Sequence, residues 1–175
     1  MVGRDLNQLI NSAEVARETT LASENVQSML ASYTTTTIGP MLVCQEFLPL
    51  LRRAACRGML SGLRGDKAAV VNVSSSCGSL SLVEGWEWKQ DVGYRCSKAA
   101  LNMLTQCQAL TYRLWGILCI AIHPGGAASQ VGAEQVGSEI PTMECRIRGI
   151  LDVLAKLSAA DNGTFLDWKG DVVPW

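Results

Sequence analysis

A tyrosine and a lysine stand four residues apart in the segment GYRCSK, as Tyr94 and Lys98, just before the apolar helical pattern AALNMLTQCQAL. Residues i and i+4 share one face of a helix, so the ammonium of Lys98 would lie close to the phenol of Tyr94. A nearby cation lowers the pKa of a tyrosine, whose ordinary value of about 10 suits proton transfer at neutral pH poorly. The spacing indicates an acid–base pair, although an isolated YxxxK is more often an ordinary helix start with a solvated lysine.

A second candidate is Ser75, the middle serine of the segment NVSSSCG. This serine ends an apolar run, and the helix that carries Tyr94 and Lys98 begins after one loop, so a hydroxyl, a phenol and an ammonium can converge on one crevice. The alternative for Ser75 is a serine that caps a helix or closes a turn in a polar run.

The surrounding pattern predicts which elements position these residues. Strands are expected at LNQLINSA (6–13), AAVVNVSS (68–75), ILCIAIH (117–123) and TFLDW (164–168). Helices are expected from about Ser23 to 58, with possible breaks at Pro40 and Pro49, over 92–116 with Gly116 at the end, and over 141–159. Strands that are apolar throughout and alternate with helices are typical of an α/β, doubly wound parallel sheet, here as one domain, 1–175. Ligands of such sheets bind at the carboxyl ends of the strands.

Composition excludes several classes of function. A net charge of −1 provides no basic field for nucleic acid, and the first residues contain no long apolar stretch of the kind that a signal peptide or a membrane span needs. We therefore expect a cytoplasmic protein with no nucleic-acid or membrane partner. The seven cysteines form no CxxC pair, and there is one histidine, so we expect reduced core cysteines and no metal site.

The motifs NVSSSCG, YRCSK and HPGG, in this order, resemble the short-chain dehydrogenase/reductase family. Within this family, the chain resembles most the C-factor and sniffer branch of carbonyl reductases. Three further segments share this resemblance, namely LNQLINSAEVA, FLPLLRRAA and the tail NGTFLDWKG. The resemblance spans nearly the whole chain. Several motifs in the right order are more specific than any one of them. The resemblance implies a Rossmann-like fold, NADP(H) as the cofactor and a small carbonyl compound as the substrate.

The resemblance also implies a role for each residue. Ser75 would donate a hydrogen bond to the substrate carbonyl, Tyr94 would protonate the developing alkoxide as hydride arrives, and Lys98 would lower the pKa of Tyr94 and hold the nicotinamide ribose. The other cofactor-binding residues would be Asn11, Ala13, Pro124, Gly125 and Ser129. The family gives His123 no catalytic role, and we expect it to be structural.

Three departures from the family pattern make cofactor binding by this chain doubtful. The chain begins just before the strand that is fourth in the family, so it is expected to be N-terminally truncated, without the TGxxxGxG turn that holds the pyrophosphate and with the 6–13 strand as an exposed sheet edge. Glu14 replaces a glycine that lies near the cofactor, and Thr36 aligns with an asparagine of the proton relay. The glycine-containing segment 58–65 precedes a strand and is expected to be a loop.

Two hypotheses follow, and cofactor binding separates them. The first is an NADP(H)-dependent carbonyl reductase, impaired in this truncated form. The second is an inactive relative that acts by pairing, for instance as a homodimer through the helix 94–115 and the helix before it, with Leu101, Leu104 and Gln108 on the shared face. A third, an α/β domain without chemistry, would require all the motif matches to be coincidences.

Overall fold

Four parallel strands form the centre of the molecule in the computed structural model, which describes residues 5–56, 63–83, 85–126 and 141–175. They are β1 (Gln8–Asn11), β2 (Ala69–Val73), β3 (Leu118–His123) and β4 (Phe165–Asp167), in the order β1-β2-β3-β4. Each strand pairs in parallel with the next, as in the register Val71 with Ile120. The predicted class, a parallel sheet built from alternating strands and helices, is confirmed.

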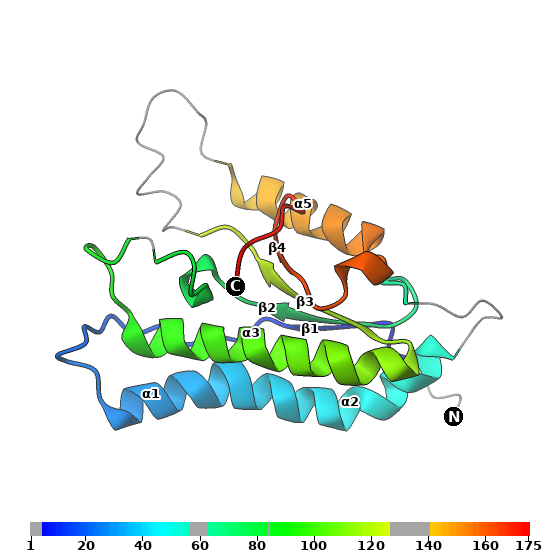
Figure 1. Cartoon of the computed structure of the whole chain (residues 1–175), viewed down its shortest axis with the longest axis horizontal. Coiled ribbons are helices and arrows are strands. Elements are labelled where there is room, and N and C mark those ends of the chain that lie inside the picture. Colours follow the sequence, from blue (N-terminus) through cyan, green and yellow to red (C-terminus); the bar gives the residue numbers. More distant parts are fainter. Residues whose placement is uncertain (1–4, 57–62, 84, 127–140) are drawn as a thin grey trace.

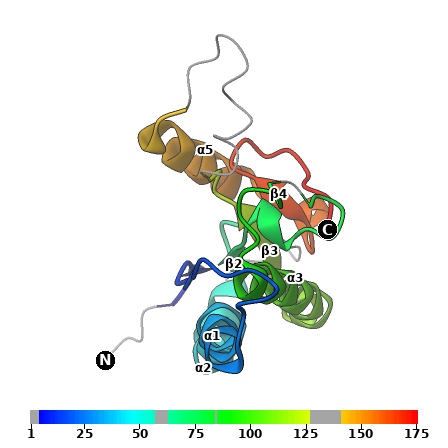
Figure 2. The same ribbon diagram turned by 90° about the vertical axis from the view of Figure 1, so that its left-hand side faces the viewer.

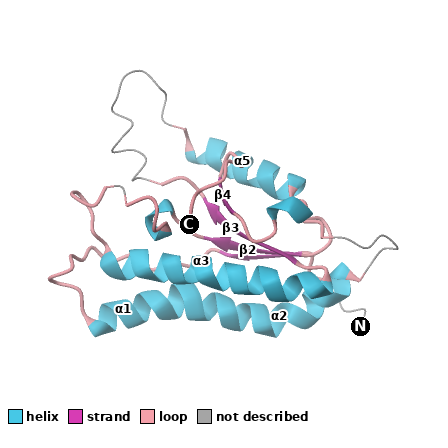
Figure 3. Cartoon of the chain, viewed as in Figure 1, coloured by secondary structure: helices cyan, strands magenta, loops and turns pink. Residues whose placement is uncertain are grey.

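Helices cover both faces of this sheet. One face carries α1 (Val26–Tyr33), a π-helical turn (Thr34–Ile38), α2 (Gly39–Ala55) and α3 (Val92–Tyr112), while α5 (Met143–Lys156) lies on the other face, as Figures 1 and 2 show. Figure 3 shows the strands between the two helical layers. Among the described residues, no helix is both long enough and apolar enough to cross a lipid bilayer.

The first predicted helix differs from the observed one in its start and its continuity. Its N-cap is Asn25, not Ser23, because the Asn25 side chain accepts a hydrogen bond of 3.0 Å from the Ser28 amide. The two prolines do not break the helix. Pro40 is the second residue of α2 and has no N–H, so it cannot donate the usual helical hydrogen bond to the carbonyl of Thr36. The π-helical turn before Pro40 accommodates this missing hydrogen bond. The chain therefore stays helical from Val26 to Ala55.

The central strands are fully buried, and the first strand is not. The α5 side of the sheet packs Val71, Ile120 and Ile122 against Val153 and Leu154, and all but Val153 are less than 5% exposed. By contrast β1 is half-buried, and Ile10 is 48% exposed, because among the described residues β1 has a strand on one side only. The predicted run 6–13 thus becomes a strand of four residues at an edge of the described sheet, and the expectation that this strand forms an exposed edge is confirmed.

Two expectations about helix faces and cysteines are also wrong. Leu101 and Gln108 are 1% and 4% exposed, so they face the sheet and cannot form an outer pairing surface. All seven cysteines are free, as expected, but only Cys44 and Cys119 are buried. The others lie on half-exposed or exposed positions, because an apolar helical run has one face toward solvent.

Gly78 allows the turn after β2 to touch the backbone of α3. A Cβ at this position would lie 2.7 Å from the Cβ and carbonyl carbon of Lys98 and 2.9 Å from the Ala99 nitrogen. These are mostly backbone atoms, which cannot move aside. The absence of a side chain at Gly78 therefore fixes how closely Ser75 and Lys98 approach each other.

We predict that Gly78→Ala destabilises the protein by about 1–3 kcal/mol, because the added methyl group forces the turn away from α3. The free energy of unfolding from urea titration measures this change. Gly126→Ala is the control, since its Cβ would meet only the His123 ring at 3.9 Å and should cost little. Equal stability of the two variants would contradict the argument.

Candidate functional site

The predicted residues Ser75, Tyr94 and Lys98 lie around one crevice at the carboxyl ends of the strands. Ser75 follows β2, and Tyr94 and Lys98 lie in the first two turns of α3. Ser75 and Tyr94 line a cavity of about 330 Å³, together with Glu14 from the segment after β1 and His123 from the end of β3. Sequence reasoning predicted this convergence from the two strand ends and the start of the helix.

Lys98 is the most deeply buried charge of the crevice, with no solvent exposure. Its Nζ donates a hydrogen bond of 2.8 Å to the carbonyl oxygen of Val73 and lies 2.8 Å from Oε2 of Glu14. Burial lowers the pKa of Lys98, while the hydrogen bond and the charge of Glu14 act against that shift. The ammonium thus joins the end of β2 to α3 and has a carboxylate beside it.

Tyr94 shares the same carboxylate. Its hydroxyl donates to Oε2 of Glu14 at 3.1 Å, and Nζ of Lys98 lies 5.5 Å from the centre of its ring. Burial is the largest cause that raises the pKa of Tyr94, the charge of Glu14 raises it further, and a hydrogen bond with Ser75 lowers it. The pKa of Tyr94 is therefore raised and not lowered as expected, first because the phenol is buried and second because the carboxylate of Glu14 lies beside it.

Ser75 caps a turn, which is one of the two roles considered for it, and it also lies at the cavity. Its Oγ accepts a hydrogen bond of 3.2 Å from the Cys77 amide and caps a short 3₁₀ turn, Ser76–Gly78. Ser75 also lines the cavity together with Tyr94 and is 8% exposed there. Ser75 is therefore held in a fixed position at the wall of the crevice.

A buried polar network that sequence reasoning missed fixes the position of β2 on α3. The amide of Asn72 donates to Oγ1 of Thr105 and Oε1 of Gln108, each at 2.8 Å, and its oxygen accepts from Asn11 at 2.8 Å. Asn72 has no solvent exposure, and both its donors and its acceptor have partners. An asparagine inside an otherwise apolar strand is the one signal that could have revealed it.

A second link joins the serine run to α3. Oγ of Ser74 donates to Oδ1 of Asn102 at 2.6 Å, and Nδ2 of Asn102 donates to the carbonyl of Gly78 at 3.2 Å. The Ser76 amide donates to Nδ1 of His123 at 3.2 Å, so the histidine ties β3 to this turn. Burial lowers the pKa of His123 and favours the neutral ring that accepts this bond. These contacts hold the turn that contains Ser75 from both sides.

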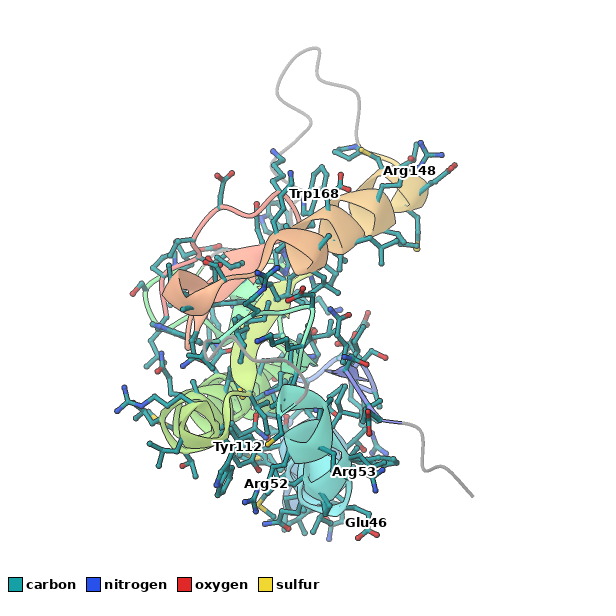
Figure 4. All side chains as sticks on the ribbon, turned by 90° about the vertical axis from the view of Figure 1, so that its right-hand side faces the viewer. Glu46, Arg52, Arg53, Tyr112, Arg148 and Trp168 are labelled. Atoms are coloured by element: carbon teal, nitrogen blue, oxygen red, sulfur yellow. The ribbon has the colours of Figure 1, made fainter. Side chains whose placement is uncertain are left out.

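Two of the other predicted cofactor-binding residues lie directly after β3. Pro124 and Gly125 follow β3, and Gly125 has a φ of +73°, in the region that favours glycine. A Cβ at Gly125 would also lie 3.0 Å from Arg146 and Trp168. Trp168 itself lies beside α5, as Figure 4 shows, where Gly149 leaves space for its ring. The end of β3 is therefore closely packed under α5.

Asn11 and Ala13 follow the edge strand. The amide of Asn11 donates to Asn72 and to Sγ of Cys44, so its side-chain donors are used inside the fold, whereas Ala13 is exposed. Ser129 lies outside the described residues. Thr36, at the position of the expected relay, has no solvent exposure, and within the described chain its hydroxyl has no hydrogen-bond partner. Its neighbour Thr37 bonds to the carbonyl of Ser97 at 3.0 Å.

Comparison with known proteins agrees with this geometry. Residues 2–139 match the family model described as short chain dehydrogenase. The chain belongs to the short-chain dehydrogenase family. It is 31% identical over 169 residues to C-signal of Myxococcus xanthus, a match that covers 95% of this chain and 91% of that protein.

Solved structures of short-chain dehydrogenases place the chain in the carbonyl reductase branch. It superposes on the NADPH-bound carbonyl reductase from chicken fatty liver with a TM-score of 0.87 at 43% identity, covering 99% of this chain and 67% of that one. The carbonyl reductase Sniffer of D. melanogaster gives a TM-score of 0.81 at 28% identity, covering 98% and 67%. The chain thus spans about two thirds of the length of these reductases and has their Rossmann-like fold.

Two hydrogen-bond donors of the described crevice converge on one acceptor atom. Nζ of Lys98 and the hydroxyl of Tyr94 both donate to one oxygen of Glu14. That oxygen shows how the two donors can converge on an acceptor, such as a ribose hydroxyl or a substrate carbonyl. Within the described ranges, no group of three or more histidine, cysteine, aspartate or glutamate side chains could hold a metal ion.

We predict that Glu14→Gln lowers the pKa of Tyr94, because a carboxylate disfavours the phenolate and a neutral amide does not. The expected decrease is about 1 pH unit. Spectrophotometric titration of the phenolate measures it, with Tyr94→Phe as the control that identifies this tyrosine among the three. An unchanged or higher pKa of Tyr94 in Glu14→Gln would contradict the assigned role of Glu14.

Proposed function

We propose that this protein is an NADP(H)-dependent oxidoreductase of the carbonyl reductase type that acts on small carbonyl compounds. The observation that carries the proposal is that Ser75 and Tyr94 line one cavity, while Lys98 lies behind it and binds Glu14 of the same cavity wall. The chicken liver reductase, whose structure contains NADPH, supports the choice of cofactor. The seven free cysteines support a cytoplasmic location.

In the proposed reaction, the bound cofactor supplies a hydride to the carbonyl carbon. Ser75 holds the carbonyl oxygen through its hydroxyl, and Tyr94 transfers its proton to that oxygen as negative charge develops there. Lys98 stabilises the resulting phenolate through its positive charge and offers a donor to the nicotinamide ribose. The backbone at Pro124 and Gly125 would lie against the nicotinamide, and Asn11, Ala13 and Ser129 are proposed as further cofactor contacts.

We further propose that the 175 residues bind the cofactor weakly. The sequence contains no TGxxxGxG turn to hold the pyrophosphate. Glu14 also places a carboxylate on the two donors that the ribose and the substrate would use, and its charge opposes a phosphate nearby. The same contact raises the pKa of Tyr94, which makes proton transfer harder.

Titration of the purified chain with NADPH tests the cofactor proposal, with nicotinamide fluorescence as the readout. We expect an increase in NADPH affinity in Glu14→Gly, because this change removes the competing carboxylate, and weak binding by the unchanged chain. Glu144→Gly is the control, since Glu144 lies on α5 in an exposed ion pair with Arg148. Equal NADPH affinity in the unchanged chain and Glu14→Gly would contradict the proposal.

Reduction of an aromatic ketone by NADPH tests the catalytic roles. Tyr94→Phe should lower kcat/KM by about 100-fold or more, because it removes the proton donor. Tyr112→Phe is the matched control, since Tyr112 lies at the far end of α3 against Trp115. A Tyr94→Phe variant as active as the control would rule out the assigned chemistry.

A second candidate function is pairing with another chain, for which the outer face of α3 is the specific observation. Met103 and Leu110 of α3 are 65% and 60% exposed, and their spacing of seven residues places them on one side of the helix. Leu114 lies in the 3₁₀ turn Arg113–Trp115 that follows α3 and is 77% exposed. The neighbouring α2 exposes Leu42 and Phe47. We propose a homodimer through these two helices, with Met103, Leu110 and Leu114 in place of the buried Leu101 and Gln108.

Light scattering during size-exclusion chromatography tests the homodimer. The unchanged chain should have the mass of a dimer and Leu110→Glu that of a monomer, because a carboxylate would be buried in the interface. Leu151→Glu on α5 is the control, as it changes an exposed leucine on the other face of the sheet. A monomeric unchanged chain, or a dimer that Leu110→Glu leaves intact, would contradict the pairing.

A further inference from the structure

Asp91 is a strained residue in the wall of the proposed active-site cavity. Its φ and ψ of 43° and 51° place it in the left-handed region, and it is the one non-glycine residue with positive φ among the described residues. Such a backbone conformation costs free energy in residues with a side chain and is concentrated at functional sites. Asp91 lines the same cavity as Ser75 and Tyr94 and stands three residues before Tyr94.

Asp91 occupies the N-cap position of α3, but its side chain does not cap the helix. That task belongs to Glu24, whose Oε2 accepts a hydrogen bond of 2.8 Å from the Gly93 amide. Glu24 is held there by the hydroxyl of Thr19 at 2.6 Å, the largest of the causes that lower the pKa of Glu24 to about 2. Because another residue caps the helix, helix capping does not explain the carboxylate of Asp91.

The carboxylate of Asp91 has one oxygen with a partner and one without. Oδ2 lies 3.0 Å from Nζ of Lys89, whereas Oδ1 is buried and has no hydrogen-bond partner within the described chain. The whole residue is 4% exposed. A buried carboxylate oxygen that accepts no hydrogen bond is costly. Because Asp91 belongs to the cavity wall, this oxygen is a candidate acceptor for a donor on a bound ligand.

We propose that Asp91 determines substrate specificity by accepting a hydrogen bond from a hydroxyl or ammonium group of the carbonyl substrate. The inference rests on the proposed carbonyl reduction at Tyr94, and it names the substrate class as ketones or aldehydes that carry a hydrogen-bond donor beside the carbonyl. The cavity of about 330 Å³ has room for such a compound, and Trp88 in its wall offers an aromatic surface for the rest of it.

The test compares phenyl ketones that carry a hydroxyl or an ammonium group on the side chain with analogues in which a methyl group replaces the donor. Isothermal titration calorimetry measures their binding to the unchanged chain and to Asp91→Asn, since asparagine also tolerates the left-handed conformation. We expect the unchanged chain to bind at least one class of donor ketone about 10-fold more tightly than its methyl analogue, and Asp91→Asn to lose this preference. The hydroxyl and ammonium series show which donor Asp91 prefers.

Lys89→Met is the control, because it removes the same ion pair and leaves Oδ1 of Asp91 in place. The preference for donor ketones should persist in this variant. Equal binding of donor and methyl ketones, no detectable binding of any of them, or loss of the preference in Lys89→Met as well would overturn the inference.

Turnover with NADPH separates this inference from the proposed function. Reduction of donor and methyl ketones with the same efficiency, in the unchanged chain and in Asp91→Asn alike, would leave the reductase proposal intact and refute the role of Asp91. An Asp91-dependent preference in binding, with no ketone reduced under any condition, would support the role of Asp91 and refute the proposed catalysis.

Discussion

The buried ammonium of Lys98 is the interaction on which the rest of the site depends. A fully buried cation must have hydrogen-bonded partners, and here they come from the end of β2, through the Val73 carbonyl, and from the segment after β1, through Glu14. The same lysine lies where Gly78 brings the serine turn against α3. One charge therefore links three segments that are distant in the sequence, and Ser75 and Tyr94 take their positions from those segments.

Polar contacts, more than apolar packing, determine this arrangement at the strand ends. Asn72, Ser74 and Asn102 use their side chains to connect β2 and the turn after it to β1 and α3. Apolar packing of β2 and β3 between the helical layers is not directional and would tolerate small shifts of a helix along the sheet. Directional hydrogen bonds between buried side chains do not tolerate such shifts, so they hold the turn that contains Ser75 in place against α3, which carries Tyr94.

Much of the fold could be predicted from the sequence, because apolar runs and their turns depend on local pattern. The four strands and the long helices lie where the periodicity places them, and the meeting of Ser75 with Tyr94 follows from parallel strands that end at one edge. The contact of Glu14 with Lys98 could not be predicted, since the sequence shows only a carboxylate in a loop 84 residues from the lysine. The left-handed backbone conformation of Asp91 could not be predicted either. Aspartate, like asparagine, tolerates this conformation, but most aspartates do not adopt it, so the residue type alone does not indicate it. The buried side of α3 was misjudged because leucines lie on both of its faces.

A double-mutant cycle between Glu14 and Lys98, read from urea unfolding, tests the central claim most directly. The variants are Glu14→Gln, Lys98→Met and the double variant. If the carboxylate is the charge partner of the buried ammonium, Glu14→Gln is destabilising when Lys98 is present and nearly neutral when methionine replaces it, with a coupling of about 1 kcal/mol or more. A coupling indistinguishable from zero would show that Glu14 does not hold Lys98, and would contradict this account of the site.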